Sequence, residues 1–194
     1  MAYTASMQHS GLHSRTIVVS ALAVLAALVF VVRFGLSVET LQYVALTALL
    51  GWASIEDLRS RTIPNECILA MVGNRVVYSA LLAMFGRFEA GECVYYFASG
   101  LGTGAVLLLF ALVFERVTGR EGMGGGDVKL YAVAGLYLGV DGAAFVAFLS
   151  CMFALAAAVL TKSARGEAEG LARTLPFGPA IAASIILVAL AMAH

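Results

Sequence analysis

Two aspartates in the sequence lie beside turns that interrupt long apolar runs. Asp57 stands seven residues before Pro64, and Asp127 directly follows three consecutive glycines. Two carboxyl groups held close together cannot both ionise easily, so they share one proton. Such a pair offers a carboxylate that activates water and a carboxylic acid that polarises a carbonyl, which is the chemistry of an aspartic peptidase.

Each aspartate also has a purely structural interpretation. Asp57 can be a solvated acid beside Arg59 and Arg61. Asp127 can be the N-cap of a helix, because Asp is favoured at that position, and we expect a helix to open there. Lys129 follows the glycines as in a phosphate-binding loop, but the Walker spacing of Gly-Lys-Ser/Thr is absent.

The segment after Asp57 predicts the end of one helix and the start of another. Pro64 cannot continue a helix and biases Ile63 away from helical torsions. Asn65 is a good N-cap residue, so we expect the next helix to start near it. Asp57 is then expected at the point where its helix leaves the apolar layer.

The composition predicts a membrane protein. The chain has 194 residues, of which 61% are hydrophobic and 12% charged, and a soluble domain of this length needs more polar surface. The net charge is zero, which argues against nucleic acid as a partner. The three cysteines form no CxxC pair, so neither a zinc site nor a disulfide framework is indicated.

The apolar runs predict an all-α polytopic transmembrane bundle of about seven spans, the fifth of them short. We expect a polar tail over residues 1–15, an extra N-terminal transmembrane helix over 16–37, and a membrane-embedded core over 38–194. The expected spans are roughly 16–34, 38–56, 66–85, 93–117, 128–139, 142–161 and 177–192.

The distribution of basic residues predicts the orientation. Nine of the twelve basic residues fall in the tail, loops and helix ends on one side of the predicted spans, and only Arg33 and Arg87 on the other. Basic loops stay cytosolic, so we expect a cytosolic N-terminus. Asp57 and Asp127 are then both expected at the cytosolic ends of their helices.

The motifs resemble those of a known family. The run 122–130, Gly-Met-Gly-Gly-Gly-Asp-Val-Lys-Leu, resembles the GxGD motif of the type IV prepilin peptidases. The run 57–65, ending Ile-Pro-Asn, resembles the other aspartate motif of that family, and the run 176–179 resembles the start of its last helix. The resemblance covers about residues 40–190 and implies that Asp57 and Asp127 are the catalytic pair.

The resemblance also implies a substrate and a place in the cell. Such enzymes remove the short leader from prepilins or pseudopilins of type IV pili, Flp-type pili or type II secretion, at the cytosolic face of the bacterial inner membrane. Membrane lipid surrounds them, and the peptidase step needs no metal and no cofactor. Residues expected to support the pair or to bind substrate are Asn65, Glu121, Gly124, Gly125, Gly126 and Lys129.

One departure narrows the expected activity. Long members of the family carry an N-terminal domain with two CxxC pairs, and this sequence has none. We therefore expect a short-form peptidase without N-methylation of the product.

Two other function classes stay open from the residues alone. A transporter or proton pathway could also use two membrane aspartates, although such proteins often show internal repeats and broken helices, and no repeat is visible. A structural or assembly protein could pack its helices through small residues such as Gly100, Gly102 and Gly104.

Overall fold

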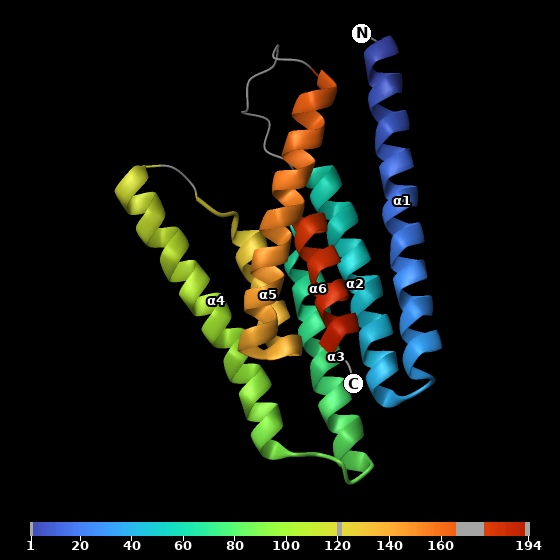
Figure 1. The fold of residues 1–194 in the computed structure, drawn as a ribbon, viewed down its shortest axis with the longest axis vertical. Coiled ribbons are helices and arrows are strands. Elements are labelled where there is room, and N and C mark those ends of the chain that lie inside the picture. The colour runs from blue at the N-terminus through green and yellow to red at the C-terminus, as the bar shows by residue number, and fades with distance from the viewer. Residues whose placement is uncertain (1, 120–121, 166–176, 193–194) are drawn as a thin grey trace. The chain divides into compact units, whose positions relative to one another are not determined.

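The computed structural model describes residues 2–119, 122–165 and 177–192 (Figure 1). Every regular element within these ranges is an α-helix, which confirms the predicted all-α class. The helices are α1 (Ala2–Phe34), α2 (Val38–Ser60), α3 (Asn65–Met84), α4 (Ala90–Thr118), α5 (Gly125–Arg165) and α6 (Gly178–Met192). The helices α1 to α5 are long and apolar enough to cross a membrane, and α6 is shorter but apolar.

The helices form two compact units, residues 1–89 and 90–194. In the first unit, α2 packs against both α1 and α3. The helix α1 comes close to α2 at Gly51, where a Cβ would lie 3.1 Å from the Cβ of Ala23. The α1 helix begins at Ala2, so the predicted polar tail over 1–15 is largely a continuation of the first spanning helix.

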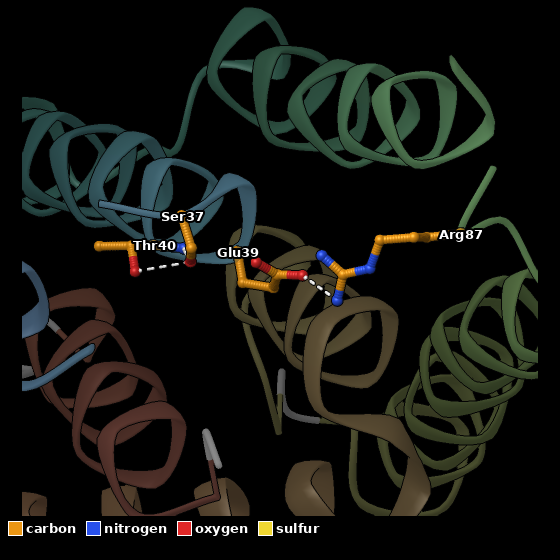
Figure 2. Close-up of polar contacts among 4 residues, drawn as sticks. All are labelled: Ser37, Glu39, Thr40 and Arg87. Carbon is orange, nitrogen blue, oxygen red and sulfur yellow. Dashed lines mark hydrogen bonds and ion pairs between the residues drawn. The ribbon is translucent and has the colours of Figure 1, made fainter. Parts of the chain in front are cut away.

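Polar contacts fix the start of α2 (Figure 2). The Thr40 backbone N–H donates to Ser37 Oγ at 3.1 Å, which makes Ser37 the N-cap of the helix. Two residues further on, Glu39 forms an ion pair with Arg87, whose Nη2 lies 3.1 Å from Glu39 Oε1. The pair joins the start of α2 to the segment that follows α3.

In the second unit, α5 packs against both α4 and α6. The helix α5 is interrupted at Gly139, which has φ 72° and ψ −176°. The Tyr131 hydroxyl lies 2.6 Å from Ser150 Oγ, although nineteen residues of straight helix would span about 28 Å. The chain therefore reverses at Gly139, and Figure 1 shows the two parts running side by side.

The two parts of α5 correspond to the predicted fifth and sixth spans. We call residues 125–138 the first arm and residues 140–165 the second arm. Counted separately, they make the helices consistent with the expected seven spans. The first arm starts three residues earlier than the predicted span, because Gly125 and Gly126 are helical instead of forming a linker.

Small residues allow α4 to approach the first arm closely. A Cβ on Gly100 would lie 3.0 Å from the carbonyl oxygen of Ala132, and a Cβ on Gly104 would lie 3.0 Å from the Cβ of the same alanine. Gly102 has nothing within 4 Å of such a position. Two of the three glycines expected to pack therefore do so, and Gly102 does not.

Candidate active site

Asp57 lies inside the last turn of α2 and not beyond its end. The helix continues to Ser60, four residues past the predicted end of this span. Asp57 extends a stripe of buried residues that recurs at helical spacing along α2, after Leu50, Ala53 and Ser54. Its 7% exposure contradicts the interpretation of Asp57 as a solvated loop acid.

The turn after Asp57 is fixed by the residue that ends the helix. Arg61 has φ 54° and ψ 29°, in the left-handed region, and its backbone N–H donates to the carbonyl oxygen of Asp57 at 3.0 Å. This is a left-handed helix cap of the kind usually formed by glycine. The chain then turns inward, so that Ile63 is buried beneath the turn.

Asn65 is the first residue of α3 and not its N-cap. The N-cap position is taken by Pro64, which offers no side-chain hydrogen bond. Pro64 is extended, with φ −62° and ψ 142°, and this conformation directs the chain into the helix without a polar cap. Asn65 is exposed, so its side chain is accessible next to the turn that follows Asp57.

Asp127 is the third residue of α5, which does not fit its alternative interpretation as the N-cap of the helix. The helix begins at Gly125, and the carbonyl oxygen of Gly124 accepts from the N–H groups of Asp127 and Val128 at 3.0 and 3.3 Å. The Asp127 carboxyl reaches back over Gly124, because a Cβ on this glycine would lie 3.4 Å from Asp127 Oδ2. A carboxylate in the first turn of a helix is stabilised by the helix dipole.

The glycines before Asp127 differ in what surrounds them. Gly122 lies against the Phe114 ring of α4. Gly125 has nothing within 4 Å of the position of a Cβ, so the start of the first arm is open on that side. Gly126 is half-buried and Lys129 is exposed. Glu121 lies outside the described residues, as does Pro176 of the last-helix motif.

Asp57 belongs to the first unit and Asp127 to the second. The pairing of the two carboxyls therefore stays a prediction. Within the described ranges, no group of three or more His, Cys, Asp or Glu side chains gathers where a metal ion could bind.

Comparison with known proteins places the chain in a family. A model of the type IV leader peptidase family matches residues 44–159, a range that contains both aspartates and the glycine run. The prepilin leader peptidase/N-methyltransferase of Bacillus subtilis is 33% identical over 159 residues, which cover 80% of this chain and 58% of that protein.

Two further relatives carry the same name. The Pseudomonas putida protein is 31% identical over 160 residues, covering 81% of this chain and 52% of the relative. The Neisseria gonorrhoeae protein is 30% identical over 152 residues, which cover 78% of this chain and 49% of that relative. The chain thus spans about half the length of the curated relatives it matches. No solved structure matches it.

The fold defines a multi-pass helical membrane protein whose two motif aspartates lie at helix ends. The family match covers 116 of the 194 residues, counted from 44 to 159, and includes the segments that hold both aspartates. The chain belongs to the type IV leader peptidase family.

Proposed function

We propose that this protein is a membrane-embedded aspartic endopeptidase that removes the leader peptide from type IV prepilins or pseudopilins. One observation carries the proposal: the family match contains Asp57, Asp127 and the glycine run within a single continuous range. The relatives named above are prepilin leader peptidases, which favours this function over a transporter or a structural protein.

The order of the helices supports pairing of the two aspartates. Asp57 is in the last turn of α2 and Asp127 is in the first turn of α5, so α3 and α4 lie between them along the chain. If both helices cross the membrane, two crossings return the chain to the side from which it started. The basic residues beside Asp57, which include Arg59 and Arg61, favour the cytosolic side of the inner membrane.

In the proposed chemistry, the two carboxyl groups share one proton. The ionised carboxylate removes a proton from water as the water attacks the scissile carbonyl. The protonated carboxyl donates a hydrogen bond to that carbonyl oxygen and stabilises the negative charge that develops there. Asn65 and Lys129 are both exposed, eight residues after Asp57 and two residues after Asp127 in the sequence, and we propose that they contact the substrate.

The direct test replaces each aspartate by its amide. We expect that Asp57→Asn and Asp127→Asn each abolish cleavage of a purified prepilin by the detergent-solubilised full chain, because an amide can neither share the proton nor activate water. Each variant should accumulate in membranes like the parent. If either amide variant cleaves at the parental rate, the proposed pair is wrong.

Two other acids provide matched controls. Glu56 precedes Asp57 and is half-buried, and Asp141 is an exposed acid just after the Gly139 break. Glu56→Gln and Asp141→Asn make the same chemical change at positions outside the proposed pair. Both variants should cleave the prepilin at rates close to the parent.

The orientation is tested separately from the catalysis. Reporter fusions placed after residue 62 and after residue 87 mark the α2–α3 and α3–α4 connections. We expect a fluorescent protein to be active only at the first position and alkaline phosphatase only at the second. The reverse pattern would place Asp57 on the outer side and contradict cleavage at the cytosolic face.

A further inference from the structure

The first arm of α5 carries a second polar residue on the same helix face as Asp127. Tyr131 follows Asp127 by four residues, so the two lie on the same face of the helix, one turn apart. Helical side chains lean toward the N-terminus of their helix, so the Tyr131 ring leans back toward the turn of Asp127. Tyr131 is only 2% exposed.

The Tyr131 hydroxyl forms a hydrogen bond with a residue of the second arm of α5. It lies 2.6 Å from Oγ of Ser150, which is fully buried. The Ser150 hydroxyl donates to the carbonyl oxygen of Ala147 at 3.0 Å. A serine hydroxyl has one hydrogen to donate, so Ser150 accepts the hydrogen bond and Tyr131 donates it.

The bond joins two helical segments whose connection is a single glycine. At one end, the first arm follows Gly124, and at the other it stops at Gly139. Neither glycine has a side chain that would resist rotation of the arm about its axis. A side-chain bond between the arms opposes such a rotation, and Tyr131 makes it one turn from Asp127.

We infer that Tyr131 and Ser150 are positioning residues of the peptidase, because their hydrogen bond sets the rotation of the first arm and hence the direction of the Asp127 carboxyl. Neither residue needs to touch the substrate. The inference rests on the proposed function, in which Asp127 takes part in catalysis. It adds two residues that lie outside the aspartate motifs.

The test compares two replacements of Ser150 that differ only in the hydroxyl. Thr and Val have nearly the same volume, so any effect of the added methyl group is common to both. We expect Ser150→Val to lower kcat by about 10-fold or more with KM within about twofold of the parent, because a displacement of about 1 Å at a reacting group costs up to about 100-fold. Ser150→Thr should retain several-fold more kcat than Ser150→Val.

Tyr131→Phe removes the same bond from the other side. It should lower kcat as Ser150→Val does, and the Tyr131→Phe/Ser150→Val double variant should be about as active as either single variant, since one bond is lost in each case. Ser184→Ala is the control. Ser184 is also fully buried in this unit, but its Oγ donates to the carbonyl oxygen of Ala180 on its own helix at 2.8 Å, so kcat should not change.

A second measurement does not depend on catalysis. Amide hydrogen exchange over residues 125–130 should be faster in Tyr131→Phe and Ser150→Val than in the parent or in Ser150→Thr. Parental kcat and parental exchange in Ser150→Val would overturn the inference. If Asp57→Asn and Asp127→Asn remain active while exchange rises as expected, the proposed function fails and the role of the bond in holding the arm stands.

Discussion

Gly135 in the first arm of α5 lies directly against the backbone of Ser99 in α4. A Cβ on Gly135 would be 2.7 Å from the Ser99 carbonyl oxygen and 2.7 Å from Thr103 Oγ1. Distances this short to a backbone atom cannot be relieved by moving a side chain. The absence of a side chain at Gly135 therefore sets how close α4 and the first arm come to each other.

Gly135→Ala should separate these two helices. We expect a loss of about 1–3 kcal/mol in the free energy of unfolding, the usual range for overpacking a close contact, measured by thermal or denaturant unfolding in detergent. Gly102→Ala is the matched control in α4, because nothing lies within 4 Å of its added Cβ. That variant should be neutral or slightly more stable, since alanine favours helix over glycine. Equal stability of the two variants would contradict the close contact.

Gly139→Ala should disturb the reversal between the two arms of α5. The φ of 72° and ψ of −176° fall in a region that is almost exclusively populated by glycine, at a cost of about 1–3 kcal/mol for other residues. An added Cβ would also lie 2.8 Å from Tyr95 Oη. We expect a lower unfolding temperature in detergent than for Gly91→Ala, whose added methyl group meets no neighbour within 4 Å.

Arg61 ends α2 in a left-handed conformation, which favours glycine at this position. Arg61→Gly and Arg61→Ala both remove the arginine side chain. The two variants then differ in the backbone conformation that each residue prefers. We expect Arg61→Gly to be the more stable variant by about 1–2 kcal/mol, the cost of this conformation for a residue with a Cβ. Equal unfolding temperatures would mean that the turn after Asp57 changes conformation in the variants.

Gly125→Ala tests whether the substrate lies along the start of the first arm. The added methyl group has no neighbour within 4 Å, so folding should be unaffected. If a prepilin backbone binds beside Asp127, the methyl group occupies its space, and we expect KM to rise several-fold. Gly73→Ala, an equally open position in α3, serves as the control. An unchanged KM in Gly125→Ala would argue against a substrate path over the glycine run.

The Glu39–Arg87 ion pair should contribute little to stability. The Arg87 side chain is 64% exposed and that of Glu39 35%, and exposed pairs are worth up to about 1 kcal/mol before solvent screening. We expect Arg87→Ala to change the free energy of unfolding by less than about 0.5 kcal/mol, and any effect to shrink further at high salt. A loss of several kcal/mol would show that Arg87 has a larger structural role.

The sequence predicted the helices better than the surroundings of the site. Long apolar runs gave the number of spans, and Gly139 and Gly142 marked the reversal that the structure shows at Gly139. The end of α2 was placed too early, because the acids and arginines around Asp57 resemble a polar loop. The helix instead continues because Asp57 completes a buried stripe, which depends on packing between helices and not on local composition.

The bond between Tyr131 and Ser150 was not foreseen, because the residues are nineteen positions apart and belong to neither aspartate motif. The spacing of four residues between Asp127 and Tyr131 was the one signal available in the sequence. It identifies a shared helix face, but not the partner on the other arm. The start of α5 within the glycine run was also missed, since glycine is a poor helix former by propensity.

The break at Gly139 also has a consequence for water. It limits the first arm to fourteen residues, 125–138, which rise about 21 Å, whereas the hydrocarbon layer of a bilayer is about 30 Å thick. An arm this short reaches from one surface of that layer to the other only where the surrounding lipid thins or water follows the chain inward. Peptide hydrolysis consumes one water molecule per bond, and if Asp127 is catalytic as proposed, water that follows the first arm inward would lie on the same arm as that aspartate.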